Sequence, residues 1–554
     1  MIVYRAQDSA AATEDLIVSI DVALRREPDH SAIQDLLISY GEFEAAAMDA
    51  LMPDRDGLSP EVRALRNSAE QSGLLFEASR CDEPVDYGGF ERAFAAVRQR
   101  RLPGTLRVTV PEGYAFYGLF PEAYSKAARR FATTERPRHV CVIGIRSIGT
   151  SLSVAVAAAL QKVGIPVWTC TVRPHGHPFD RELRLTGELR DEWRRWAAAG
   201  SQFAVVDEGP GLSGSSFLAV TSALNEIGIG NEQIVLFPSW AGNADSFVND
   251  RARETWPRYR KYVGDPEPLL PPGPIEDLSA GLWRERVPGA RDIPSQPQHE
   301  ALKYLAENKT LLKFSGLGRH GREKLAVAQM LADTGFSPRA FEFDQGFIEF
   351  DFVPGKPLVP PLLPPDFVHK LASYTAFRAQ NLRASERSVG FDGLLEMMEQ
   401  NAKQGSQFRY LRREFENRPA ILVDGRMMPH EWIETAKGPL KTDSVDHCRD
   451  HFYPGHADPA WDLAATAIEF ELNPGQRGAL IERYRKLSGD RVSPAILNFY
   501  EAAYAAFRTG YSALAAQATT GTPDHDRFGA MQGKYAGALA KALSLEAANQ
   551  QVIA

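Results

Sequence analysis

The stretch from Phe203 to Phe217 restricts the fold of this chain more than any other part of the sequence. It reads Phe-Ala-Val-Val-Asp-Glu-Gly-Pro-Gly-Leu-Ser-Gly-Ser-Ser-Phe, an apolar run followed by two acids and a loop of small residues. The apolar run, Phe203 to Val206, is too short for a helix and is typical of a buried parallel strand. Apolar residues at helical spacing predict a helix from Ser215 to Ile227. We therefore expect an α/β domain with a parallel sheet, and this loop at the carboxyl end of one strand.

The loop between the strand and the helix has the composition of an anion-binding site. Backbone N–H groups at a helix N-terminus point at one spot where the helix dipole favours negative charge, so a phosphate suits this position. Asp207 and Glu208 can accept hydrogen bonds from vicinal hydroxyls, directly or through a divalent cation. A sugar phosphate carries both kinds of group. An ordinary strand–turn–helix corner with an acidic edge is the alternative. The residues that we expect to bind the phosphate are Gly209, Gly211, Ser213, Gly214 and Ser215.

This order of apolar residues, paired acids and a Gly/Ser loop resembles the PRPP-binding motif of the type I phosphoribosyltransferases. The resemblance implies that Asp207 and Glu208 are catalytic and anchor the ribose, with PRPP as substrate and Mg²⁺ as cofactor. Many members of that family carry Thr where this chain has Ser213, Ser215 and Ser216. Either hydroxyl can bond a phosphate oxygen.

A second segment supports this interpretation. The apolar run from His139 to Ile145 precedes a loop and an Ala- and Val-rich helix. The corresponding loop of the family holds pyrophosphate, and a mobile hood loop follows the next strand, here residues 164–172. We expect the acceptor to lie against residues 105–125 and 173–180. In the second of these segments, His175 and His177 are equally compatible with contact to the pyrophosphate and with a solvated loop. The resemblance implies that the pyrophosphate binds to Arg146, Ser147, Gly149 and Thr150.

The sequence pattern after residue 300 differs from that of the preceding region. Residues 310–314 form a strand-like run around Lys313, and residues 316–321 spell G-x-G-x-x-G before a helix that reaches Asp333. A dinucleotide fold would need a second βαβ unit and an acid at the end of its next strand. Residues 338–358 instead predict two antiparallel strands, so we reject the parallel dinucleotide fold.

The same region resembles the aminoglycoside-phosphotransferase-like kinases. Lys313 in a strand and Glu323 in the following helix match the N-lobe, and residues 421–433 occupy the place of the catalytic loop. The resemblance implies an α+β two-lobed kinase-like domain with Mg²⁺ that binds ATP through Lys313 and Glu323. Phosphoryl transfer needs a Lys on the phosphates, an acid on the metal and an acid near the acceptor hydroxyl. The acids that the resemblance puts forward are Asp424 as catalytic residue, and Asp443 and Glu431 as metal ligands.

The match to the kinase pattern has gaps. In the family the catalytic acid precedes its Pro by three residues, whereas Asp424 precedes Pro429 by five. Glu431 stands where the family has a metal-binding Asn, and no glycine-rich loop is evident before Lys313. An active kinase, a degenerate kinase fold without catalysis and an unrelated α+β domain all stay open.

Length and composition set the domain organisation. A chain of 554 residues exceeds what one core supports. We expect a mainly helical region over 1–104, a phosphoribosyltransferase-like domain over 105–256, a Pro-rich linker over 257–300 and a kinase-like domain over 301–554. The net charge of −8 and pI of about 5.9 argue against a nucleic-acid partner. Scattered cysteines and the absence of a signal peptide or long apolar stretch indicate a cytoplasmic protein. The sequence is also compatible with assembly into a homo-oligomer.

The main functional hypothesis from the sequence is an enzyme that transfers a phosphoribosyl group from PRPP to a small-molecule acceptor, coupled to an ATP-binding kinase-like domain. Two alternatives stay open. One is a regulatory protein that senses PRPP or a nucleotide without catalysis. The other is a small-molecule kinase with a phosphoribosyltransferase-like scaffold.

Overall fold

The computed structural model describes residues 9–553 except 82, 178, 212, 265–274, 359, 361, 362, 365 and 451. The chain forms two compact units. The N-terminal unit runs to Pro271 and also takes in Gly316–His320, and the C-terminal unit comprises the rest of the chain from Pro272. One sheet is parallel and the others are antiparallel, so the protein belongs to the mixed α/β class. Residues 265–274 of the expected linker lie outside the described residues.

A five-stranded parallel sheet is the frame of the N-terminal unit. Its strands follow the spatial order β4 (Val167–Val172), β3 (Val140–Ile145), β7 (Gln202–Val206), β8 (Ile234–Phe237) and β9 (Arg260–Lys261). All neighbouring pairs are parallel. Every residue of β3 and β8 is buried, which explains why these strands read as continuous apolar runs. The parallel sheet predicted from the sequence is confirmed.

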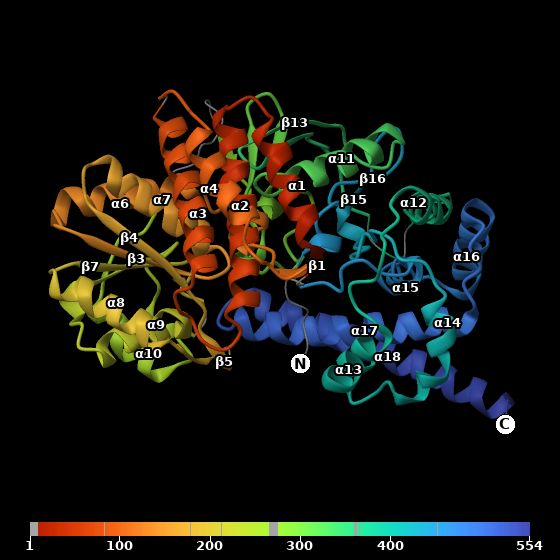
Figure 1. The fold of residues 1–554 in the computed structure, drawn as a ribbon. Coiled ribbons are helices and arrows are strands. Elements are labelled where there is room, and N and C mark those ends of the chain that lie inside the picture. The colour runs from red at the N-terminus through yellow and green to blue at the C-terminus, as the bar shows by residue number, and fades with distance from the viewer. Residues whose placement is uncertain are drawn as a thin grey trace. The chain divides into compact units, whose positions relative to one another are not determined.

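Helices cover both faces of this sheet (Figure 1). One face carries α6 (Pro121–Glu135) and α7 (Gly149–Lys162), and the other carries α8 (Gly187–Ala198), α9 (Ser215–Glu226) and α10 (Asp250–Thr255). The helix predicted to begin at Ser215 does so. Gly214 precedes it with a φ of 65°, a left-handed conformation that favours glycine.

The helices predicted for the first hundred residues are present and share a core with Val154 and Ala155 of α7. They are α1 (Thr13–Leu24), α2 (His30–Leu51), α3 (Pro60–Arg80) and α4 (Gly88–Arg98). The remaining elements around the sheet are the antiparallel pair β1 (Ser9–Ala12) and β2 (Thr105–Val108), the short helix α5 (Glu112–Ala115), and the hairpin of β5 (His175–His177) and β6 (Asp180–Glu182).

The C-terminal unit begins with an antiparallel sheet. Its spatial order is β10 (Ile275–Asp277), β11 (Lys303–Ala306), β12 (Thr310–Phe314), β14 (Phe347–Asp351) and β13 (Ala340–Asp344). Helix α11 (Arg319–Asp333) connects β12 to β13. The antiparallel pairing of β13 with β14 agrees with the sequence analysis and excludes a parallel dinucleotide-binding sheet here.

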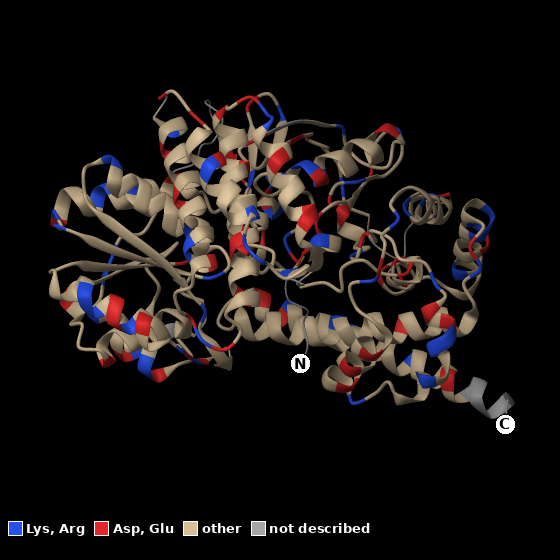
Figure 2. Ribbon diagram, viewed as in Figure 1, with Lys and Arg blue, Asp and Glu red and all other residues tan. Residues whose placement is uncertain are grey.

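The rest of the C-terminal unit is mostly helical and packs around one apolar core. Its elements are α12 (Phe367–Asn381), α13 (Phe391–Ala402), α14 (Arg412–Glu416), β15 (Trp432–Ile433), β16 (Leu440–Lys441), α15 (Pro459–Glu469), α16 (Pro474–Ser488), α17 (Pro494–Ala518) and α18 (Pro523–Ile553). Acidic and basic residues are interspersed along the helices of both units (Figure 2). Among the described residues, no helix combines the length and the apolar character needed to span a bilayer.

Candidate functional site

The predicted catalytic loop of the C-terminal unit is held beside the predicted metal-binding acid by a short ladder. Strands β15 and β16 pair antiparallel with Trp432 opposite Lys441. Trp432 is fully buried in the core and therefore anchors this ladder. Because Glu431 precedes β15 and Asp443 follows β16, the ladder brings these two acids to the same end.

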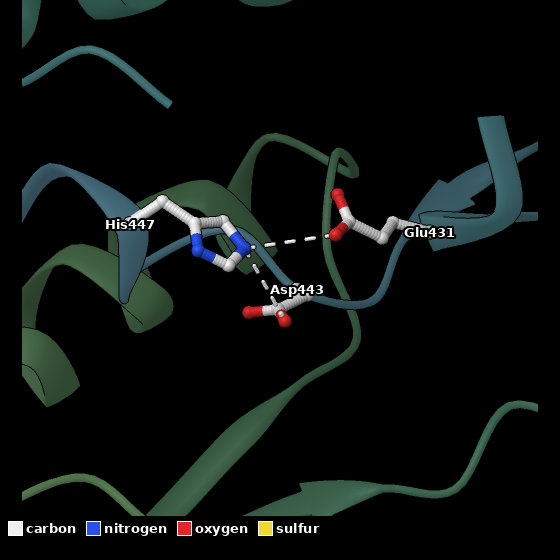
Figure 3. A group of neighbouring side chains, drawn as sticks. All are labelled: Glu431, Asp443 and His447. Carbon is white, nitrogen blue, oxygen red and sulfur yellow. Dashed lines mark ion pairs between the residues drawn. The ribbon is translucent and has the colours of Figure 1, made fainter. Parts of the chain in front are cut away.

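A third residue joins the two acids. One ligand atom each from Glu431, Asp443 and His447 lies within 4.8 Å of the others (Figure 3). The Nε2 atom of His447 is 3.6 Å from Oε1 of Glu431 and 3.5 Å from Oδ2 of Asp443. In the sequence, residues 443–451 add two acids and two histidines close to the expected metal, a pattern compatible with a supporting network or with a different metal site. The structure brings His447 of this segment to the two acids.

The charges around this group shift the pKa values of its members. Burial acts to raise the pKa of Asp443, but Lys313 and His447 outweigh it and hold that pKa well below the ordinary value. Arg426 and Lys441 likewise outweigh burial and hold the pKa of Glu431 low. Burial acts to lower the pKa of His447, and the neighbouring carboxylates raise it overall. Both acids are therefore ionised at neutral pH.

Lys313 projects from β12 onto two carboxylates. Its Nζ atom is 2.7 Å from Oδ1 of Asp443 and 2.5 Å from Oδ2 of Asp446. Burial acts to lower the pKa of Lys313, but these two acids raise it above its ordinary value. Glu323, which the sequence analysis grouped with Lys313, forms an ion pair with Arg449. Lys313 is thus a permanent cation next to the predicted metal-binding acid.

The helix α11 contributes a second lysine to the site. The Nζ atom of Lys324 is 2.9 Å from Oδ1 of Asp446. Lys324 is the residue after Glu323 in the chain, so it leaves the helix in a different direction. Asp446 is one of the acids of the segment 443–451 expected near the metal, whereas no pattern in the sequence pointed to Lys324.

Asp424, the predicted catalytic acid, is enclosed by the protein. It is 2% exposed. The hydroxyl of Tyr374 donates a hydrogen bond to Oδ2 of Asp424 at 2.5 Å, and Nζ of Lys441 is 3.4 Å from the same oxygen. The backbone N–H of Asp424 donates to Asp462 of α15 at 2.8 Å. In this arrangement Asp424 fixes the loop and Lys441, and its carboxylate is closed off from solvent by its protein partners.

Arg426 is the residue that precedes Pro429 by three positions, where the kinase pattern has its acid. Its Nε donates to Oε1 of Glu431 at 2.6 Å, and Nη2 is 3.8 Å from Oδ2 of Asp443. The side chain of Arg426 is 24% exposed and that of Asp443 is 19% exposed. Glu431 is 4% exposed and Lys441 is fully buried. Arg426 and Asp443 therefore form the end of the site that solvent reaches.

The N-terminal unit places the predicted sugar-phosphate residues at the carboxyl end of β7. Asp207 and Glu208 follow this strand directly and are half-buried. The backbone N–H of Gly113 donates to Oε2 of Glu208 at 3.0 Å. Burial raises the pKa of Asp207 to about 7. Burial, Glu112 and Asp207 raise the pKa of Glu208 to about 8.

The predicted phosphate loop lies between these acids and α9. The Oγ atoms of Ser213 and Ser215 are 2.9 Å apart, and both residues are buried. Arg181 of β6 donates from Nη1 to Oγ of Ser216 at 2.9 Å. The hairpin of β5 and β6, which begins in the expected hood segment 173–180, thus contacts the first turn of α9.

The predicted pyrophosphate loop lies against the end of β7. A Cβ at Gly149 would be 2.6 Å from the carbonyl oxygen of Val206, so the close approach requires glycine. Ser147 has a φ of 98°, which is unusual for a residue with a side chain. Thr150 is fully buried. The predicted pyrophosphate loop therefore lies against the carboxyl end of β7, the end at which the predicted phosphate loop begins.

The arginines near this loop are bound to aspartates of the helical region. The Nε of Arg146 donates to Oδ1 of Asp49 at 2.7 Å, and Asp56 binds the same guanidinium. The Nε of Arg173 also donates to Oδ1 of Asp49 at 2.7 Å. Arg146 is 4% exposed, so its charge is neutralised inside the protein. A pocket beside the loop is lined by residues that include Asp49, Tyr114, Ser147, Ser151 and Arg173.

Comparisons with known proteins identify similar solved structures only. No protein-family model matches the chain, and no curated protein does so. Choline kinase LicA from Streptococcus pneumoniae is 18% identical, with a TM-score of 0.31, 43% of this chain covered and 89% of that chain. A choline/ethanolamine kinase family protein from Mesorhizobium loti is 15% identical, with a TM-score of 0.34 and coverages of 50% and 95%. The GDP complex of aminoglycoside 2'-phosphotransferase-IIIa is 12% identical, with a TM-score of 0.31 and coverages of 50% and 95%.

Proposed function

We propose that the C-terminal unit is an ATP-dependent small-molecule phosphotransferase. The observation that carries this proposal is the position of Lys313, a buried strand lysine 2.7 Å from Asp443, which follows the predicted catalytic loop and β16 in the chain. A strand lysine beside an acid after the catalytic loop is the arrangement that phosphoryl transfer uses to hold phosphates. Strand order supports the same interpretation, because a helix connects β12 to β13 within an antiparallel sheet.

Two cations of this site are placed to contact the phosphates of a nucleotide. Arg426 reaches solvent, and its guanidinium can donate two hydrogen bonds to one phosphate. Lys313 is a compact charge that stays protonated because Asp443 and Asp446 raise its pKa. Positioning and charge stabilisation supply most of the catalysis in phosphoryl transfer, so these two side chains would do the principal work.

The test is release of ADP from ATP by the full chain. The assay offers small hydroxylated compounds, amino alcohols and aminoglycosides among them, with a blank that lacks an acceptor. We expect ADP above the blank with at least one compound and its loss in Lys313→Met. ADP release that is the same in wild type and Lys313→Met would contradict the proposal.

A second function is favoured by one observation in the N-terminal unit. Asp207 and Glu208 carry raised pKa values at the carboxyl end of β7, where the phosphate loop begins and the loop around Gly149 packs against the strand end. Carboxylates of this kind become ionised when ribose hydroxyls or a cation bind to them. We propose that this corner binds PRPP, with the phosphate on residues 209–215 and the pyrophosphate on residues 147–150.

This second proposal includes transfer of the phosphoribosyl group to an acceptor. The alternative is a protein that senses PRPP without transfer. Titration with PRPP followed by a pyrophosphate-release assay separates the two. Binding with release indicates transfer, and binding without release in a broad acceptor screen indicates a sensor. No binding of PRPP would contradict both.

A further inference from the structure

The acids of the C-terminal site are already matched by cations of the protein. The ion-pair cluster consists of Asp424, Glu431, Asp443 and Asp446 with Lys313, Lys324, Lys441 and Arg426. It therefore holds four carboxylates and four cations, each paired within 4.0 Å of an opposite charge. No negative charge is left over for a further ion in this set of residues.

The pairing of acids with cations is most evident at Glu431 and Asp443, the two predicted metal ligands. Each oxygen of Glu431 accepts from a cation, Oε1 from Nε of Arg426 at 2.6 Å and Oε2 from Nζ of Lys441 at 2.8 Å. Oδ1 of Asp443 accepts from Nζ of Lys313 at 2.7 Å. Mg²⁺ binds oxygen at about 2.1 Å in a strict octahedron. An ion that close to both acids would lie against the guanidinium of Arg426, so the residues present do not fit Mg²⁺.

The position of Arg426 in the motif explains the difference. The kinase pattern has an acid three residues before Pro429, and this chain has Arg426 there. An acid at position 426 would make the cluster more negative by two charges, which is the charge of one divalent ion. The exchange of acid for arginine thus removes the need for the ion and puts a cation in its place.

We propose that the guanidinium of Arg426 takes the place of a divalent cation in this site, so that the site binds nucleotide phosphates without Mg²⁺. The proposal deepens the phosphotransferase function and rests on it for the identity of the ligand. The ion pairs of Glu431 and Asp443 exclude Mg²⁺ whatever ligand the site binds. A guanidinium binds phosphate oxygens with two parallel hydrogen bonds, so it can hold the group that a metal would otherwise bridge.

The first experiment needs no nucleotide. Binding of Mn²⁺ alone to the full chain is measured by the loss of the free-ion signal in electron paramagnetic resonance. We expect Arg426→Ala to bind about one more equivalent than wild type. This gain should disappear in Arg426→Ala with Asp443→Asn. Arg449→Ala, which removes an arginine paired with Glu323, is the matched control and should behave as wild type. Arg426→Gln, with circular dichroism on every variant, serves where Arg426→Ala does not fold.

Two results would overturn the proposal. One is a Mn²⁺ site in wild type that Asp443→Asn abolishes. The other is a folded Arg426→Ala or Arg426→Gln that gains no ion. A second experiment compares ATP affinity with Mg²⁺ and with chelator, and we expect wild type to change less than about twofold and Arg426→Ala more than about tenfold. A failure of ATP to bind at all would contradict the phosphotransferase function, while the Mn²⁺ result would still decide the role of Arg426.

Discussion

The Nε of Arg426 lies 2.6 Å from Oε1 of Glu431, so the two side chains form an ion pair within the loop before β15. The charges of the two residues neutralise each other. Lys441 contacts both Glu431 and Asp424, so it connects this pair to the buried end of the ion-pair cluster.

Glu431→Gln and Asp443→Asn should have different effects. Glu431 is buried between Arg426 and Lys441, so its neutralisation leaves buried cations poorly paired. We expect Glu431→Gln to lower the free energy of unfolding by about 3 kcal/mol. Asp443→Asn should weaken ATP binding more than Glu431→Gln does, because Asp443 orients Lys313 at the open end of the site.

Urea denaturation and calorimetric titration with ATP measure the two effects. Asp392→Asn is the control, since Asp392 forms an exposed ion pair with Arg412 and should change neither quantity. Equal ATP affinity of Asp443→Asn and wild type would contradict the role given to Asp443.

Asp207→Asn with Glu208→Gln should abolish PRPP binding and leave the fold intact. As carboxylates, both side chains offer two acceptor oxygens to the ribose hydroxyls. The amides of Asn and Gln offer only one acceptor oxygen and carry no charge. Glu226→Gln, at the exposed end of α9, is the matched control. Calorimetric titration with PRPP and circular dichroism are the measurements. PRPP binding by the double variant at wild-type affinity would rule out the N-terminal assignment.

The same two acids should make the stability of the protein fall as the pH rises. In the folded state the pKa of Asp207 is raised to about 7 and that of Glu208 to about 8. In the unfolded chain both groups lose their protons near pH 4. Between these values the folded state holds more protons, so each rise in pH favours unfolding.

We expect the free energy of unfolding to fall by several kcal/mol between pH 5 and pH 9, and the Asp207→Asn, Glu208→Gln variant to show a smaller decrease. Urea denaturation at several pH values measures this. If the wild type and the double variant gave parallel profiles, the raised pKa values would be wrong.

The Pro-rich stretch should be the site of limited proteolysis. Cleavage is expected between Gly264 and Ile275, because the division between the two compact units falls there in the sequence and Pro-rich segments are typical of domain boundaries. Each fragment should keep a cooperative thermal transition, and mass spectrometry with scanning calorimetry would show both. Resistance at this stretch together with one single transition would count against two units.

The fold was predictable where local patterns decide it. The strand ending at Val206 and the helix beginning at Ser215 follow from an apolar run and a loop of small residues, and the structure has both. Lys313 was expected in a strand and lies in β12. In these segments the pattern along the chain and the tertiary structure agree.

The partners of the charged side chains were not predictable in the same way. Arg146 was assigned to a pyrophosphate, but its guanidinium binds Asp49, which is 97 residues earlier in the chain. Nothing in the local sequence indicates which acid a buried arginine meets, because tertiary packing brings them together. Arg426 was missed for a different reason: it lies three residues before Pro429, and only Asp424, five residues before that proline, was considered as the acid of this loop.

The central claim is that Lys313 and its neighbours bind the phosphates of ATP. Calorimetric titration of ATP into wild type, Lys313→Met and the exposed control Lys309→Met tests it most directly. We predict saturable binding by wild type and Lys309→Met, and an affinity lower by at least about tenfold in Lys313→Met, because a buried lysine that contacts phosphate contributes more than about 1.4 kcal/mol. Equal affinity of all three proteins for ATP, or no binding by wild type, would contradict the claim.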